Sequence, residues 1–128
     1  MYAVELDRSK RLLVISAVGH VTAQEVKGVA QRVREVLKQA APGFHVLADF
    51  RWLESMDSTA APHLAEIMDA LTEQGVGSVT RVFSDPRKDI GLNILSQFHY
   101  WPNVSITTFE TLADAIQSIA AKTDFESG

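Results

Sequence analysis

The 128-residue chain contains no cysteine. This absence excludes disulfide frameworks and thiolate-bound zinc or iron–sulfur sites, and it favours a reducing, cytoplasmic location. Long hydrophobic runs are also missing, because a typical run, Leu12–Ile15, is short, and no basic segment precedes the first strand-like pattern. We therefore expect neither a membrane span nor a secretion signal. The formal net charge of −4 argues against nucleic-acid binding, which needs a surplus of Lys and Arg.

Motifs for the common catalytic chemistries are absent as well. The sequence has no glycine-rich phosphate loop, and its first strand-to-helix turn lacks the glycine spacing of a dinucleotide motif. The four histidines are never spaced as ligand pairs on one helix, and the serines, Ser16 and those near Ser55 included, lack a nucleophile-elbow pattern. Asp49 and Asp57 are residue types that a magnesium site accepts, but nothing else supports one. We therefore expect no enzyme, no metal and no cofactor.

What the sequence does contain is a regular alternation of strand-like and helix-like patterns. The expected strands are 2–7, 11–18, 44–50, 76–83 and 104–109, and the expected helices begin near Thr22, Ser58, Asp85 and Thr111. Gly19 is expected to end the second strand. This order predicts an α/β fold with a mostly parallel mixed sheet, an antiparallel N-terminal edge hairpin and four helices. The length predicts one domain, residues 1–122, followed by a frayed tail at 123–128.

The start of the first helix is the best-specified boundary. Thr22 and Glu25 have the spacing of a capping box, and Val21 and Val26 have that of a hydrophobic staple. Apolar residues then recur every three or four positions, which predicts a buried stripe on the helix. The stripe consists of Val26, Val29, Ala30, Val33 and Leu37. In the last helix, the apolar positions expected to face the core are Leu112, Ile116 and Ile119.

The stretch VLADFRWLESMDSTA resembles the signature of the STAS domain, the family of bacterial anti-sigma-factor antagonists typified by SpoIIAA. In that family a strand ends in an acid or amide, and shortly afterwards an Asp-Ser pair begins a helix and its Ser is phosphorylated. Asp49 matches the strand end, while Asp57, Ser58 and Thr59 match the pair and the residue after it. The segments SAVGHVTAQEV and TFETLADAIQSI are also similar to the family, so the resemblance covers nearly the whole chain.

Two positions depart from the family pattern. Ala60 stands where the family has a glycine, and Pro62 stands where a second small residue is usual. A helix capped by Ser58 would make Pro62 its fourth residue and forfeit a hydrogen bond to the Ser58 carbonyl. A later start, with Thr59 as the cap, leaves Pro62 in the first turn, where proline is tolerated.

The resemblance implies a non-enzymatic regulatory module that binds a serine kinase, an anti-sigma factor or another regulator. In this interpretation the helix after Ser58 docks on the partner, Ser58 accepts phosphate, and Asp57 and Thr59 shape the loop. A phosphate there would add about −1.5 to −2 charge beside Asp57 and repel an acidic or apolar partner face. The alternative is that Ser58 or Thr59 only caps the helix. The edge strands of a small open sheet would also allow a homodimer.

A second interpretation comes from the aromatic residues Trp52, Tyr100 and Trp101. They are expected either to pack in the core or to line a pocket. The chain also resembles SpoIIAA-like and SEC14-like proteins, which implies a carrier or sensor of a small apolar or lipid-like ligand. Basic side chains that would meet an anionic group are expected at the same edge of the molecule: Arg51, Arg87 and Lys88.

Overall fold

The computed structural model describes residues 1–89, 99–100 and 103–127, and within them the chain forms a five-stranded sheet. The strands are β1 (Tyr2–Asp7), β2 (Leu12–Val21), β3 (His45–Met56), β4 (Ser78–Val82) and β5 (Ser105–Phe109), and they lie side by side in this order. β1 pairs antiparallel with β2, and every other pairing is parallel. The expected mixed sheet with an antiparallel edge hairpin is therefore confirmed.

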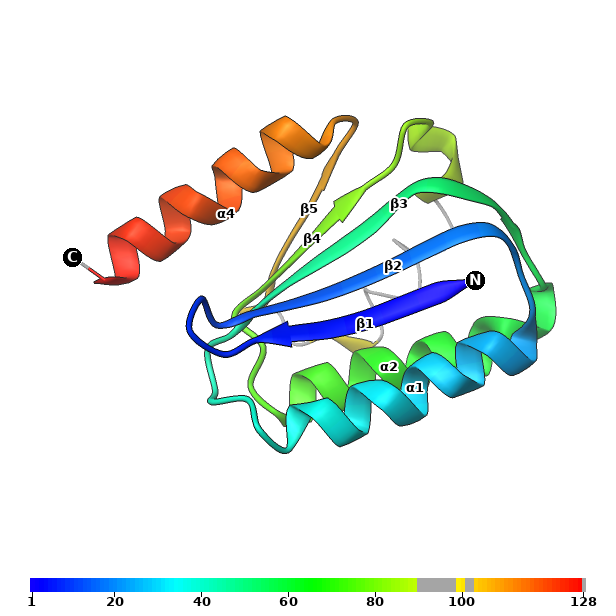
Figure 1. The fold of residues 1–128 in the computed structure, drawn as a ribbon, viewed down its shortest axis with the longest axis horizontal. Coiled ribbons are helices and arrows are strands. Elements are labelled where there is room, and N and C mark those ends of the chain that lie inside the picture. The colour runs from blue at the N-terminus through cyan, green and yellow to red at the C-terminus, as the bar shows by residue number, and fades with distance from the viewer. Residues whose placement is uncertain (90–98, 101–102, 128) are drawn as a thin grey trace.

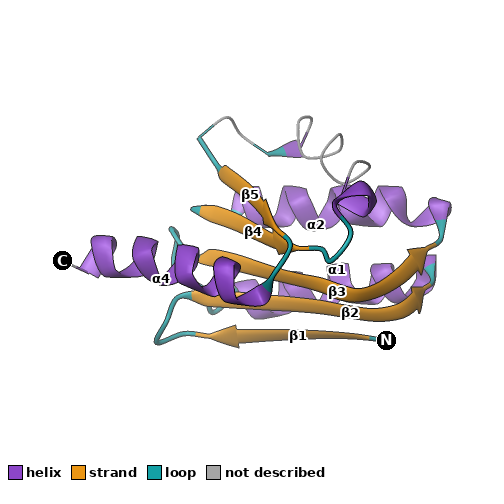
Figure 2. Ribbon diagram, turned by 90° about the horizontal axis from the view of Figure 1, so that it is seen from above, coloured by secondary structure: helices purple, strands orange, loops and turns teal. Residues whose placement is uncertain are grey.

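Helices lie on both faces of the sheet (Figures 1 and 2). The elements are α1 (Ala23–Leu37), α2 (Ala61–Glu73) and α4 (Leu112–Ser127), with 3₁₀ turns η1 (Ser58–Ala60) and η2 (Pro86–Asp89). α1 and α2 pack side by side under one face, and α4 crosses the other face over β3, β4 and β5. The described residues thus contain three α-helices where four were expected. Most of the expected third helix falls on residues 90–98, which lie outside the described residues.

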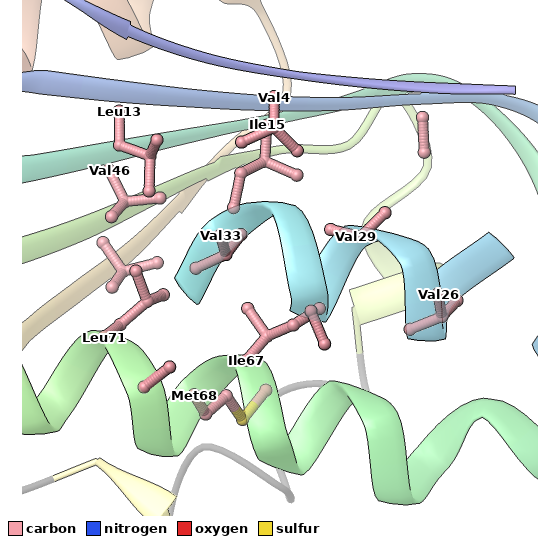
Figure 3. Packing of buried hydrophobic residues seen from close by; sticks show 14 of the residues in the cluster. Val4, Leu13, Ile15, Val26, Val29, Val33, Val46, Ile67, Met68 and Leu71 are labelled. Atoms are coloured by element: carbon pink, nitrogen blue, oxygen red, sulfur yellow. The ribbon is translucent and has the colours of Figure 1, made fainter. Parts of the chain in front are cut away.

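The main core fills the space between the sheet and the two helices below it (Figure 3). The predicted stripe of α1 is confirmed, because all five of its members are buried. Leu13 and Val33 have no exposed surface, and Val46 and Leu71 are 1% exposed. Burying each such side chain contributes about 1.5–3 kcal/mol relative to leaving it in water. This layer holds α1 and α2 against the sheet and positions their N-termini.

A smaller core lies under α4, and here one prediction is wrong. Ala115 and Ile119 pack against Leu47 and Val82 of the sheet. Ile116, which was expected to face the core, is 51% exposed. Successive residues of a helix are rotated by about 100°, so the side that presents Ala115 to the sheet turns Ile116 towards solvent. The predicted tail boundary at residue 122 stays a prediction, and α4 continues to Ser127.

β2 and β3 are both longer than predicted. Gly19 does not end β2, because its φ of +73° lets the strand continue to Val21 through a register shift at Gly19/His20. β3 likewise continues to Met56, so the expectation that Asp49 stands at a strand end is wrong. The two extensions pair with each other along their length, a long-range contact that no local pattern encodes. As a result these two strands end farther along the chain than expected.

Candidate functional site

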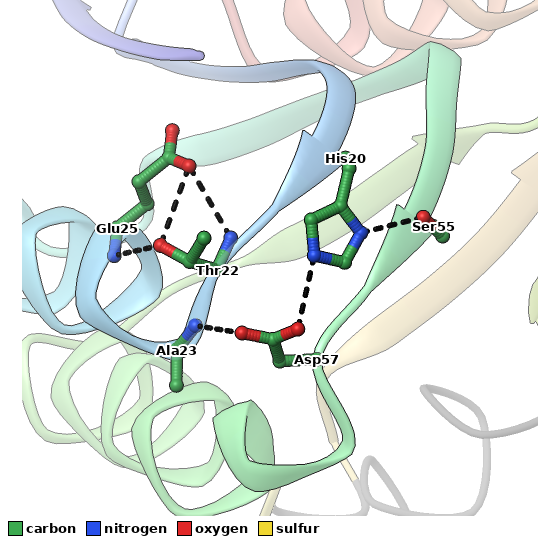
Figure 4. Close-up of polar contacts among 6 residues, drawn as sticks. All are labelled: His20, Thr22, Ala23, Glu25, Ser55 and Asp57. Atoms are coloured by element: carbon green, nitrogen blue, oxygen red, sulfur yellow. Dashed lines mark hydrogen bonds and ion pairs between the residues drawn. The ribbon is translucent and has the colours of Figure 1, made fainter.

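Asp57 joins the carboxyl end of β3 to the start of α1. Its N–H donates to the Val21 carbonyl at 3.0 Å, which holds it against the end of β2. Its Oδ2 accepts from the Ala23 N–H at 3.1 Å, and its Oδ1 is 2.9 Å from Nε2 of His20 (Figure 4). A carboxylate is favourable there, because the first N–H groups of a helix are unpaired and carry partial positive charge. Asp57 is thereby fixed to the β2–α1 junction.

His20 extends this network to a hydroxyl. His20 of β2 lies opposite Ser55 of β3 in the strand register, and its Nδ1 is 2.6 Å from Ser55 Oγ. The Asp57 carboxylate can only accept hydrogen bonds, so Nε2 carries the proton in the neutral imidazole. Nδ1 then accepts a hydrogen bond from the Ser55 hydroxyl. The His20 and Asp57 side chains are 51% and 39% exposed, so solvent reaches the array.

Sequence reasoning missed this array of Ser55, His20 and Asp57. His20 lies 35 positions from Ser55 and 37 from Asp57, so only the pairing of β2 with β3 brings it there. One local signal existed, since Ser55 and Asp57 are two residues apart at the end of a strand-like segment. That spacing does not identify a histidine partner.

The predicted capping box at the start of α1 is confirmed. Thr22 Oγ1 accepts from the Glu25 N–H at 3.1 Å, and Glu25 Oε1 accepts from the Thr22 N–H at 3.3 Å. Glu25 Oε2 is also 2.8 Å from the ammonium of Met1. This ammonium and then the Thr22 N–H hold the pKa of Glu25 below its usual value. Thr22 and Asp57 therefore satisfy different N–H groups of the same helix end.

Ser58 is exposed at the first position of η1, the turn that leads into α2. The N-cap of α2 is Ala60, and no side chain caps either η1 or α2. The interpretation of Ser58 or Thr59 as a helix cap is therefore wrong. The later helix start is confirmed, because Pro62 lies in the first turn of α2. Ala60 has a φ of −76° and is fully buried, so this position needs no glycine and its methyl group fills the core.

Ser58 also lines a groove of about 440 Å³ at the carboxyl end of β3. Its polar lining includes Ser55, Asp57 and Lys88, and its apolar lining consists of Leu53, Met56, Ala61, Leu64 and Phe83. The Lys88 ammonium donates to the Leu53 carbonyl at 2.9 Å, which holds this cation at the groove. The groove thus combines hydroxyl groups, the two carboxylates of Glu54 and Asp57, and one ammonium with an apolar wall.

Asp49, Arg51 and Trp52 form a separate cluster earlier on β3. Arg51 Nε and Nη2 each lie 2.9 Å from one oxygen of the Asp49 carboxylate. This guanidinium holds the pKa of Asp49 below its usual value. Arg51 Cζ is 5.7 Å from the ring centroid of Trp52, which is 64% exposed. None of the three is among the lining residues of the groove at Ser58.

Tyr100 lies apart from Trp52. It packs against the main core, and burial raises the pKa of its phenol. With the buried Arg81 it lines a partly open cavity of about 70 Å³ between the sheet and α1 and α2. The rest of the described lining is almost entirely apolar, and Trp52 does not contribute to it. Trp101, the third predicted aromatic residue, lies outside the described residues.

The described ranges hold no group of three or more His, Asp or Glu side chains placed to bind a metal ion. Within the same ranges, no helix has both the length and the apolar character needed to cross a membrane.

Comparisons with solved structures identify the fold. A protein of the DUF3478 family with a SpoIIAA-like fold, from Shewanella loihica PV-4, superposes with a TM-score of 0.70 at 18% identity, over 92% of this chain and 93% of that one. The phosphorylated form of SpoIIAA, a Bacillus cell fate determinant, gives a TM-score of 0.60 at 19% identity, over 93% and 99% of the two chains. A chain from the Pseudomonas aeruginosa complex of diguanylate cyclase SiaD with its activator SiaC gives 0.56 at 18% identity, over 85% and 93%.

The sequence matches no protein-family model, and no curated protein is significantly similar to it. The structural likeness extends over nearly the whole chain. The chain is therefore an α/β domain with the SpoIIAA-like fold, and the resemblance to the STAS domain is confirmed at the level of the fold.

Proposed function

We propose that the chain is a non-enzymatic, cytoplasmic regulatory module that binds a protein partner and is switched by phosphorylation of Ser58. The observation that carries this proposal is the position of Ser58. Its hydroxyl is exposed at the start of a helix, in a groove, directly after a residue anchored by three hydrogen bonds. A phosphate at this position would lie at the N-terminal end of η1 and α2, where the helix dipole favours an anion, so the fold would tolerate it.

The phosphate would change the charge of the groove. It adds about −1.5 to −2 charge next to the Asp57 carboxylate. Because Asp57 is bound to Val21, Ala23 and His20, it is held beside the new charge. Lys88, the only Lys or Arg among the described lining residues, offsets part of it. A partner surface that is apolar would therefore bind the unmodified groove and leave the phosphorylated one.

The structural relatives support a proposal for the class of partner. One relative is SpoIIAA, an anti-sigma-factor antagonist whose unphosphorylated and phosphorylated forms both share this fold, and another comes from the complex of SiaC with the cyclase that it activates. We infer a serine kinase, an anti-sigma factor or a comparable regulator as the partner of this chain. Homodimer formation through the open edge of β1 stays a prediction.

Mass spectrometry of the chain purified from its own host tests the switch. We expect a fraction that carries one phosphoryl group, mapped to Ser58 by fragmentation. The Ser58→Ala variant should lack it, whereas the control variants Ser55→Ala and Thr59→Val should keep it, because they change the neighbouring hydroxyl groups only. A phosphoryl group on Thr59 instead, or Ser58 left unmodified by a kinase that modifies other anti-sigma-factor antagonists, would contradict the proposal.

A second candidate function is supported by the cavity at Tyr100 and Arg81. An apolar cavity beside a buried phenol and guanidinium is suited to a small apolar ligand with a polar end. Its volume of about 70 Å³ is below the roughly 150 Å³ that accommodates benzene in an engineered cavity. A lipid-like ligand would therefore require α1 and α2 to move away from the sheet. Native mass spectrometry should show a bound molecule that is lost on denaturation, and its absence from protein purified from the host would argue against a carrier.

A further inference from the structure

We infer that Ser55 is a second modification site, a nucleophilic hydroxyl that takes an acyl group from an activated acyl donor such as an acyl phosphate or an aryl ester. The inference rests on the array of Ser55, His20 and Asp57 and on the groove beside it. It does not depend on phosphorylation of Ser58, so each can fail without the other.

The geometry is that of an activated hydroxyl. Ser55 Oγ lies 2.6 Å from Nδ1 of His20, within the range for a nucleophile and its base. Nε2 of the same ring lies 2.9 Å from Asp57 Oδ1, so the carboxylate selects the tautomer in which Nδ1 is free to take a proton. The Asp57 carboxylate is itself held by the Ala23 N–H at 3.1 Å. Nucleophile, base and orienting acid are thus connected in one line, as Figure 4 shows.

The groove supplies space and charge for the donor. Ser55 lines the same groove of about 440 Å³ as Lys88, and its apolar wall suits a short acyl chain. Lys88 is bound to the carbonyl of Leu53, two residues before Ser55 on β3. Lys88 is the cation in a lining that also carries the carboxylates of Glu54 and Asp57, and it favours the negative charge that develops on the donor oxygen during attack.

The reaction forms one bond and breaks one bond. Ser55 Oγ attacks the carbonyl carbon of the donor while its proton passes to His20 Nδ1. The tetrahedral intermediate collapses by expelling the leaving group, phosphate or a phenolate, and the proton on His20 passes to that group or to solvent. The product is an ester of Ser55, with no change in oxidation state. The modified end of β3 would present an acyl group to the groove.

Acetylation by p-nitrophenyl acetate provides the test. The protein is treated with a limiting amount of this ester, and peptide mapping with and without hydroxylamine separates serine esters, which hydroxylamine removes, from lysine amides. We expect Ser55 to be acetylated at least about tenfold faster than Ser9, since a positioned general base contributes about 10²–10⁴-fold. Ser9 is a matched control within the same molecule, because its exposed hydroxyl donates to the Asp7 carboxylate at 2.7 Å and has no imidazole partner.

Variants separate the role of His20 from general reactivity. His20→Gln should lower acetylation of Ser55 at least about tenfold, and Asp57→Asn should lower it to a smaller extent. Fragmentation of the mapped peptide distinguishes an acetyl group on Ser55 from one on Ser58, the proposed phosphorylation site. Acetylation of Ser55 no faster than that of Ser9, or equally fast in folded His20→Gln, would overturn the inference. The comparison of Ser55 with Ser9 in the wild-type protein decides the question even if a variant fails to fold.

Discussion

Replacing Asp57 with alanine tests whether this residue anchors the loop that carries Ser58 to the start of α1. The substitution removes the acceptor of the Ala23 N–H at 3.1 Å and the partner of His20 at 2.9 Å. Loss of a side-chain acceptor at a helix start costs about 0.5–2 kcal/mol. Loss of the hydrogen bond to the half-exposed His20 costs about 0.5–1.5 kcal/mol. Because the Asp57 side chain is 39% exposed and water replaces part of what is lost, we expect a decrease of about 1–2 kcal/mol in the free energy of unfolding.

Urea denaturation followed by circular dichroism measures this decrease. With a slope of about 2 kcal/mol per molar urea, the middle of the usual range, the expected change lowers the midpoint by roughly half a molar to one molar while the slope stays the same. Asp57→Asn is the matched control, because the amide keeps an oxygen for the Ala23 N–H and loses the charge. It should lose about half as much stability. Thr22→Ala, which removes the cap from a different N–H group of the same helix, should cost about 1 kcal/mol.

Hydrogen exchange locates the effect. In Asp57→Ala the Ala23 amide proton should exchange faster, whereas amides in the middle of α1 should follow global stability alone. If Asp57→Ala unfolds within about 0.3 kcal/mol of the wild type and Ala23 keeps its protection, then Asp57 does not anchor the loop. In that case the argument that the carboxylate is held beside a phosphate on Ser58 fails with it.

Three further substitutions test the packing and the electrostatics. Gly28→Ala places a methyl group 2.8 Å from the Tyr2 hydroxyl, which is the far end of an exposed side chain and can move aside. The gain in helix propensity should therefore raise stability by up to about 1 kcal/mol. A lower melting temperature would show that Tyr2 cannot move. Leu71→Ala, at a position 1% exposed, should lower the free energy of unfolding by about 2–5 kcal/mol in urea, and a loss below about 1 kcal/mol would contradict the core described. Arg51→Gln should destabilise at neutral pH. Because Arg51 lowers the pKa of Asp49, the pair stabilises the fold above the ordinary value of 3.8 and this contribution is lost as pH falls through the lowered pKa. The difference from wild type in urea should therefore vanish in acid, and a difference independent of pH would exclude this pair as its origin.

The sequence was a good guide wherever structure depends on neighbouring residues. The capping box at Thr22, the buried stripe of α1 and the alternation of strands and helices follow from spacings of two, three or four residues. Such spacings determine which side chains share a face, because the helix and the strand have fixed periods. The exposure of Ile116 shows the limit of this rule, since the width of the apolar face depends on how closely α4 contacts the sheet.

The candidate site also combines features that the sequence predicted with features that depend on tertiary contacts. Its position after a strand, next to Asp57 and Ser58, was predictable from the resemblance to the STAS domain. The strand end itself was misplaced, because β3 continues beyond Asp49 only by pairing with the extension of β2. The aromatic residues Trp52 and Tyr100 share an expected edge by pattern, yet one is exposed on β3 and the other packs in the core. Hydrophobicity alone does not distinguish these two environments.

By itself the sequence determined the fold class, the start of α1 and the presence of a hydroxyl-bearing loop after the third strand. Only the tertiary structure decided that His20 meets Ser55 and Asp57, that Asp57 holds the first turn of α1, and that Ser58 and Lys88 line one groove. The reason is physical. Local structure is set by backbone periodicity and by caps a few residues away, whereas these contacts join positions about 35 residues apart. They form only after the register of β2 on β3 and the packing of the helices have been established.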